Sequence, residues 1–211
     1  HSGSEIIFSS TKKTGSRDER ADGLRAVNSL GLEDNTGLGI NVSDKGNSVE
    51  VYQLKKTNSP DIRILVPKGV IVSFEHESQY GGEVEFRNLP NEIEVSAQYN
   101  SVKLDNVTGP LTVKTIYGSV DAIFGSVIND PVSIVSVYGH VDVSLPEATK
   151  ADLKMSTSYG EIFVAPEFKI DVDKQDGMMR FSDRVSGRIN GGGLKIDLSA
   201  NYGKIYLRKK V

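Results

Sequence analysis

The 211-residue chain contains no cysteine and no tryptophan, and aromatic residues make up only 7% of it. Without cysteine it can form no disulfide and can use no thiol in catalysis. It also lacks any run of about 18 apolar residues, the length that a membrane-spanning helix requires. Acidic residues slightly outnumber lysine and arginine, which gives a net charge of −3. No basic stripe stands out, so the charge pattern gives no reason to expect nucleic acid as a partner.

A dipeptide of Tyr followed by Gly or Asn recurs along the chain, at the boundary between one strand-like run and the next. It recurs every 18 to 21 residues, and a final interval of 43 residues is close to two periods with one copy lost. A fixed period of this length indicates a repeat architecture, in which each unit covers the apolar face of its neighbour. The copies are Tyr80-Gly81, Tyr99-Asn100, Tyr117-Gly118, Tyr138-Gly139, Tyr159-Gly160 and Tyr202-Gly203.

Each period contains two short runs in which apolar and polar residues alternate, as they do in half-buried strands. Val102 and Leu104 alternate with charged residues, and Leu111 and Val113 do so after a turn. Near-identical corners favour a chain that winds into successive turns, each stacked on the one before it, with strands about 4.8 Å apart. We therefore predict an all-β fold, a parallel β-solenoid with about 20 residues per rung, right-handed by the usual crossover rule. A two-sheet β-sandwich is the alternative.

The tyrosines have the same parity as the inward residues, since Leu111, Val113 and Thr115 precede Tyr117 in steps of two. A small residue stands two positions before each tyrosine and leaves room for a large ring. The pattern predicts a buried column of tyrosines, in chain order, and an exposed stripe that stacks on a ligand is the alternative. The residue after each ring is predicted at positive φ, where glycine and asparagine are tolerated. These residues are Asn100, Gly118, Gly139, Gly160 and Gly203.

Two segments of the chain are predicted from these patterns. Residues 1–36 form an N-terminal arm and cap, because residues 9–22 are polar and poor in apolar side chains. Residues 37–211 form a single β-solenoid domain. Within it, residues 170–190 break the period, and residues 185–189 are the candidate for the lost repeat. The run from Asp171 to Gly177 departs from the spacing of a calcium-binding EF-hand loop, so we predict no calcium site there.

The Ser/Thr-x-Tyr-Gly-x-Val/Ile units and the closing segment from Asn190 to Lys209 resemble the bacterial "putative adhesin" family of β-solenoid domains, whose function is unknown. The resemblance covers roughly residues 37–211 and includes no catalytic motif. It implies an exported protein of the periplasm or cell surface, and it allows a lipid anchor upstream of residue 1. The family resemblance favours a binding function, but it does not indicate which residues would form the binding site.

A candidate ligand site follows from the residues four positions after each corner tyrosine. If the rungs stack in register, Asp121 and Asp142 adjoin at about 4.8 Å and repel each other unless a cation, Lys103 or a ligand compensates. Phe163 and Tyr206 are then outward aromatic residues beside that acidic pair, a combination suited to contact with a sugar or a cation. We predict a ligand site at Lys103, Asp121, Asp142 and Phe163. A charged outer face without a ligand is the alternative.

Motifs for hydrolysis, phosphate binding and metal chemistry are absent, since the chain lacks His-Glu-x-x-His, the P-loop and Gly-x-Ser-x-Gly. His76 and His140 have no local ligand partner, so we predict no metal and no cofactor. The sequence favours a non-enzymatic cell-envelope module, an adhesin that binds a glycan or a protein partner. A purely structural envelope scaffold is one alternative. A carbohydrate-active enzyme is the other, because Glu83 and Glu85 are spaced about as far apart as the carboxylates of an inverting glycosidase.

Overall fold

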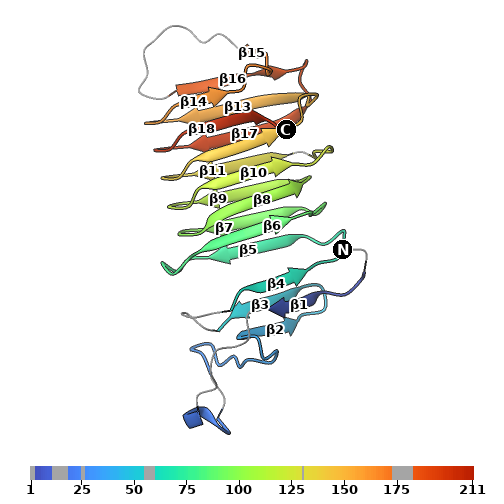
Figure 1. Cartoon of the computed structure of the whole chain (residues 1–211), viewed down its shortest axis with the longest axis vertical. Helices are drawn as coiled ribbons and strands as arrows, with labels where there is room; N and C mark the ends of the chain where they lie inside the picture. Colours follow the sequence, from blue (N-terminus) through green and yellow to red (C-terminus); the bar gives the residue numbers. More distant parts are fainter. Residues whose placement is uncertain (1–2, 11–18, 25–26, 55–59, 130, 173–182) are drawn as a thin grey trace. The chain divides into compact units, whose positions relative to one another are not determined.

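The structure is a computed structural model that describes residues 3–10, 19–24, 27–54, 60–129, 131–172 and 183–211. The chain divides into two compact units, His1–Pro67 and Lys68–Val211 (Figure 1). The boundary predicted between residues 36 and 37 lies inside the first unit. Among the described residues, every regular element except one short 3₁₀ helix is a strand, so the all-β prediction is confirmed.

The first unit consists of two antiparallel strand pairs. Strand β1 (Ile7–Ser10) pairs with β4 (Ile62–Leu65), and β2 (Ile40–Asp44) pairs with β3 (Val49–Gln53). The 3₁₀ helix η1 (Glu19–Ala21) lies between β1 and β2 in the sequence.

The loop before β2 is held together by the side chain of Asp34. Its carboxylate accepts hydrogen bonds from the backbone N–H groups of Thr36, Gly37 and Gly39 at 2.8–3.0 Å, and from the Thr36 hydroxyl. Burial of the carboxylate raises the pKa of Asp34, but these hydrogen bonds lower it by more, and the pKa lies below its ordinary value. The ionised form of Asp34 therefore stabilises this loop.

The strands of the second unit form two sheets, and each strand belongs to one of them (Figure 1). One sheet has six strands in the order β14-β18-β12-β10-β8-β6, and the other has eight in the order β15-β16-β13-β17-β11-β9-β7-β5. The strands of the six-stranded sheet are β6 (Glu83–Arg87), β8 (Ser101–Val107), β10 (Val120–Phe124), β12 (Val141–Leu145), β14 (Ile162–Val164) and β18 (Ile205–Lys209). Those of the eight-stranded sheet are β5 (Val72–His76), β7 (Ile93–Ala97), β9 (Leu111–Thr115), β11 (Val132–Ser136), β13 (Ala151–Thr157), β15 (Ile170–Val172), β16 (Asp183–Ile189) and β17 (Leu194–Ala200).

Each repeat unit is a strand of the eight-stranded sheet, a corner, and the next strand of the six-stranded sheet. Neighbouring units pair in parallel, with their residues in register, as between β9 and β11 or between β10 and β12. Antiparallel pairing in this unit of the chain is found where β16 meets β13 and β15. The prediction that units adjacent in the stack pair in parallel is confirmed. The repeat units are β5–β6, β7–β8, β9–β10, β11–β12, β13–β14 and β17–β18.

The inward residues of both sheets form one core. In β9, Leu111, Val113 and Thr115 are buried while the two residues between them are exposed, as the period-2 pattern predicts. Phe124 from the six-stranded sheet and Leu198 from the eight-stranded sheet are completely buried in the same cluster. Each such side chain contributes about 1.5–3 kcal/mol relative to an exposed one. The core therefore joins the repeat units to one another along the stack.

The C-terminal repeat unit lies inside the stack and not at its end. Strand β17 pairs with β11 on one side and with β13 on the other, so that Ile196 is the register partner of both Val132 and Leu153. Strand β18 is likewise placed between β12 and β14. The candidate for the lost repeat, residues 185–189, was assigned wrongly, because these residues belong to β16 and pair antiparallel with β13. Part of the calcium-like run, residues 173–177, lies outside the described residues.

Candidate functional site

The corner tyrosines of five repeat units form a stacked column, which we call the tyrosine ladder. Its rings follow the order of the strands, so Tyr202 lies between Tyr138 and Tyr159. Neighbouring ring centroids are 4.8–5.0 Å apart and the rings are within 19° of parallel. The predicted column is therefore present, but the prediction that Tyr138 stacks directly on Tyr159 is wrong. The ladder consists of Tyr99, Tyr117, Tyr138, Tyr202 and Tyr159.

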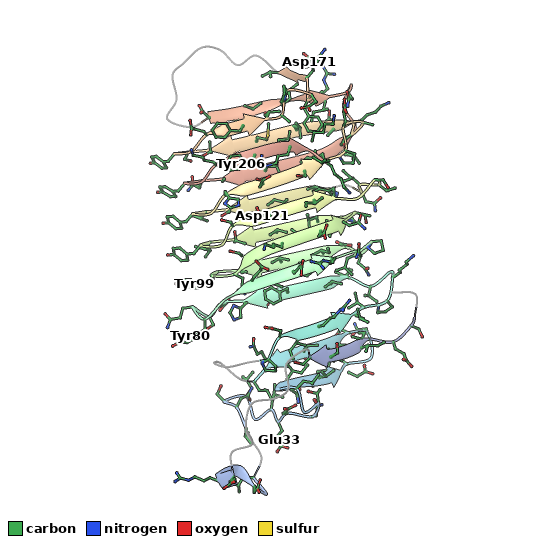
Figure 2. All side chains as sticks on the ribbon, in the orientation of Figure 1. Glu33, Tyr80, Tyr99, Asp121, Asp171 and Tyr206 are labelled. Carbon is green, nitrogen blue, oxygen red and sulfur yellow. The ribbon has the colours of Figure 1, made fainter. Side chains whose placement is uncertain are left out.

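The ladder faces solvent, which contradicts the prediction of a buried column. The exposed fraction is 39% for Tyr99, 54% for Tyr117, 51% for Tyr138, 48% for Tyr202 and 71% for Tyr159. Tyr80, the first corner tyrosine, is 61% exposed. In Figure 2, Tyr80 and Tyr99 lie at the margin of the strands, where the chain turns from one sheet to the other.

The strand ends before the ring, and this explains why the parity rule fails. Strand β9 ends at Thr115, and the backbone bends at Ile116 and Tyr117, so the alternation does not extend to the tyrosine. The same interval separates the end of β11 at Ser136 from Tyr138. A ring on a bend need not follow the in-and-out pattern of extended backbone. The bend directs each ring outward.

The small residues two positions before the five ladder rings are buried, as predicted, whereas Ser78 before Tyr80 is exposed. Hydroxyl groups among the buried residues fix the corners. The Thr115 hydroxyl donates to the carbonyl oxygen of Gly118 at 2.7 Å, and the Ser136 hydroxyl donates to the same oxygen at 2.9 Å. The Ser136 oxygen also accepts a hydrogen bond from the N–H of Gly139 at 2.9 Å. Buried polar groups of each corner thus find partners in the same or the next repeat unit.

The glycines after the rings are required for close approach and not for a left-handed backbone. The prediction of positive φ at Gly118, Gly139, Gly160, Gly203 and Asn100 is wrong, since none of them has a positive φ. Instead, a Cβ atom at Gly139 would lie under 3.0 Å from the backbone of Gly118 in the neighbouring unit. A Cβ atom at Gly203 would meet the backbone of Gly139 in the same way. The strand spacing leaves no room for a side chain there. At Gly81 the close neighbours of a Cβ atom would be the backbone of Tyr99 and the side chain of Asn100, and not another glycine.

The predicted ligand site lies on the outer face of the six-stranded sheet. Lys103, Asp121, Asp142 and Tyr206 are successive register partners in β8, β10, β12 and β18, and Phe163 of β14 follows Tyr206. The adjacency of Asp121 and Asp142 is confirmed by this register. The structure thus brings the four predicted residues into one row, which we call the acidic-aromatic row.

Both aspartates of the row have a cationic or potentially cationic partner. The Nε–H group of Arg208 donates to both carboxylate oxygens of Asp142, at 2.8 and 2.9 Å. The Asp121 carboxylate lies 2.9 Å from Nε2 of His140. These contacts offset the repulsion between the two acids. Arg208 and His140 were not predicted as partners, although Arg208 stands two residues after Tyr206 and therefore shares its face of the sheet.

Lys103 does not bind Asp121 directly. Its ammonium lies 2.7 Å from a carboxylate oxygen of Glu83, and this hydrogen bond and charge raise the pKa of Lys103. The role expected for Lys103 as the cation that compensates the acidic pair is thus filled by other residues.

The aromatic end of the row is a second, shorter stack. The rings of Phe163 and Tyr206 lie 5.4 Å apart and within 11° of parallel. The Arg208 guanidinium lies over the Tyr206 ring at 5.1 Å, and the Lys204 ammonium lies 5.5 Å from the centroid of Phe163. Phe163 is 44% exposed. This end of the sheet presents apolar ring surface beside charged groups.

Two kinds of feature are absent from the described residues. In this part of the chain, no group of three or more His, Cys, Asp or Glu side chains is arranged to hold a metal ion. The same residues include no helix with the length and apolar character needed to cross a membrane.

Comparisons with known proteins identify a family for this architecture. A family model described as Toastrack DUF4097 matches residues 82–208, more than half of the chain. A crystal structure of a "putative cell adhesion protein" from Clostridium sporogenes is 14% identical, with a TM-score of 0.49. That similarity covers 81% of this chain and 76% of the other. No curated protein matches the sequence.

Proposed function

This chain belongs to the Toastrack DUF4097 family, and from that premise we propose that it is a non-enzymatic cell-envelope module that binds a glycan or a protein partner. It is exported and acts in the periplasm or at the cell surface, where a lipid anchor upstream of residue 1 would hold it. Its second unit is a parallel, right-handed β-solenoid with about 20 residues per rung. The parallel, in-register pairing of units that each give one strand to each sheet supports this architecture.

The exposure of the tyrosine ladder is the observation that carries the proposal. Five large rings stand in solvent side by side, and the residue before each ring is also uncharged, in a chain of which 25% is charged. The residues that precede the rings are Gln98, Ile116, Val137, Asn201 and Ser158. Tyrosine enrichment with depletion of charge is typical of the core of an interface. Stacking already restricts these rings, so little side-chain entropy remains to be lost on binding.

The carboxylates of the outer face support binding over catalysis. Asp121 and Asp142 are held by His140 and Arg208 on an open sheet face, with side chains that are 46% and 21% exposed. A general acid needs a raised pKa, which is usually obtained by burial or by an uncompensated like charge. Neither arrangement is present here, since both carboxylates are partly exposed and each is in contact with a cationic or potentially cationic side chain.

Sedimentation with isolated bacterial envelope material tests the proposal. The purified chain is mixed with cell-wall glycan and, separately, with membrane-protein fractions, and the bound fraction is measured against concentration. Saturable binding to one of them is expected, with at least a tenfold loss when Tyr117, Tyr138, Tyr159 and Tyr202 are all changed to serine. A control variant carries Thr112→Ser and Lys114→Gln on the outer face of the eight-stranded sheet, and it should bind like wild type. Binding that is equal in all three proteins, or absent in wild type, contradicts the proposal.

A further inference from the structure

The faces of most rings in the tyrosine ladder are already covered. Tyr117, for example, has Tyr99 on one face at 4.9 Å and Tyr138 on the other at 5.0 Å. Internal rings therefore offer a partner only their edges and hydroxyl groups. A ligand that stacks on a ring face can use only a ring at an end of a stack. Tyr159 is the end ring with the larger exposed fraction, 71% against 39% for Tyr99.

The second aromatic stack ends on the same repeat unit. Phe163 is stacked on Tyr206, and Tyr159 is stacked on Tyr202, so both end rings belong to β13–β14 and both covering rings belong to β17–β18. The two stacks run along the same strand order, because β18 separates β12 from β14 as β17 separates β11 from β13. No further ring of the described part of the chain stacks on Tyr159 or Phe163, and the faces left without a ring are on the same side of their repeat unit.

A pair of hydrogen-bonding groups lies near the Phe163 ring. Glu161 is midway between Tyr159 and Phe163, and its carboxylate lies 2.9 Å from the ammonium of Lys204. The ammonium is also 5.5 Å from the Phe163 ring. Both side chains of this ion pair are about half exposed, at 61% and 48%. They supply an acceptor and a donor next to the ring of Phe163.

We propose that this end of the stack binds a glycan chain, with one pyranose ring on Tyr159 and another on Phe163. A pyranose presents a face of C–H groups, which packs on an aromatic ring, while its hydroxyls need both donors and acceptors. The Glu161 carboxylate accepts hydrogen bonds from hydroxyl groups, and the Lys204 ammonium donates to hydroxyl oxygens. The inference rests on the proposed binding function and narrows it to a polysaccharide at a defined set of four residues.

A titration with cellohexaose and chitohexaose tests this site, because both are neutral β-1,4-linked chains of pyranose rings with apolar faces. Binding to the full chain is measured by calorimetry, for wild type and for Tyr159→Ala, Phe163→Ala and Tyr52→Ala. Tyr52→Ala is the control, since it removes an exposed tyrosine of the first unit that is not part of the ladder. Melting temperatures show that each variant is folded.

Saturable binding of at least one hexasaccharide is expected in wild type, with at least a tenfold loss of affinity in Tyr159→Ala and in Phe163→Ala. Tyr52→Ala should change the affinity by less than twofold. Absence of binding to both sugars overturns the inference, and so does an equal loss of affinity in all three variants. The sedimentation experiment with envelope material distinguishes a failure of the glycan site from a failure of the proposed function. If wild type binds envelope material and Tyr159→Ala with Phe163→Ala binds it equally well, the glycan site is wrong while the proposed function stands.

Discussion

The ring of Tyr202 stacks on that of Tyr138 at 4.9 Å, although strands β13 to β16 lie between the two residues in the sequence. The C-terminal repeat unit therefore fills a position between two units that are already consecutive in the chain. Strands β11 and β13 both pair with β17, and no direct pairing joins them among the described residues. The last residues of the chain thus hold the two parts of the stack together.

Leu198 of β17 is completely buried at this junction, so its truncation should weaken the whole second unit. Leu198→Ala is expected to lower the free energy of unfolding by about 2–5 kcal/mol, from lost apolar burial and the cavity left behind. Urea unfolding followed by circular dichroism measures the change. Lys195→Ala, at an exposed position of the same strand, should change stability by less than about 0.5 kcal/mol. Equal stability of the Leu198 variant and wild type would show that the core does not extend through the inserted unit.

Gly139 should tolerate no side chain, because its neighbour's backbone occupies the space of a Cβ atom. Gly139→Ala and Gly139→Asn are both expected to destabilise the fold, by about 1–3 kcal/mol or more. Thermal unfolding compares them with Gly82→Ala, a corner glycine whose Cβ would meet nothing within 4 Å and whose φ is not positive. A well-tolerated asparagine at position 139 would instead support the left-handed corner that the sequence suggested.

Asp142→Asn should destabilise the protein. If the neighbouring Asp121 were the only charge near Asp142, the substitution would instead relieve repulsion between the two carboxylates. The substitution removes the charge of the carboxylate that Arg208 binds through its Nε–H group. Because both groups are partly exposed, the expected loss is about 0.5–1 kcal/mol and shrinks at high salt. A double-mutant cycle with Arg208→Gln measures the coupling. A coupling of zero, or a variant more stable than wild type, would mean that repulsion between the aspartates dominates.

The Asp34 loop should make the first unit sensitive to acid. The pKa of Asp34 is lowered in the folded state below its ordinary value of 3.8. Ionised Asp34 therefore contributes stability that is present above that value and is lost as the pH falls through the folded-state pKa. Asp34→Asn should be less stable than wild type near pH 7, and the difference should shrink below about pH 4. Urea unfolding at a series of pH values checks this, and a difference that stays constant down to pH 2 would argue against it.

The strands and core could be predicted because they depend on local alternation. Leu111, Val113, Val141 and Val143 are buried where the period-2 pattern places them. The register of Asp121 with Asp142 followed from the constant spacing of the repeats. The corners could not be predicted in the same way. The parity rule holds only for extended backbone, and the strand before each of the five ladder tyrosines ends two residues before the ring.

The position of the last repeat unit depends on tertiary packing. The alternation of Leu194, Ile196 and Leu198 is the same whether β17 ends the stack or enters it between β11 and β13. The close contacts at Gly139 and Gly203 also come from neighbouring units, and sequence spacing alone did not distinguish crowding from a left-handed turn. Both features require knowledge of which strands are adjacent.

Chemical footprinting of the tyrosines tests the central claim, that the exposed ladder is the surface that meets a partner. The free protein and the protein bound to envelope material are treated with a tyrosine-nitrating reagent, and modification is measured for each tyrosine by mass spectrometry. Tyr52, an exposed residue of the first unit, is the internal control. The account predicts nitration of Tyr117, Tyr138 and Tyr159 in the free protein and at least a fivefold decrease on binding, with Tyr52 unchanged. Equal nitration of the ladder in the free and bound protein would contradict it.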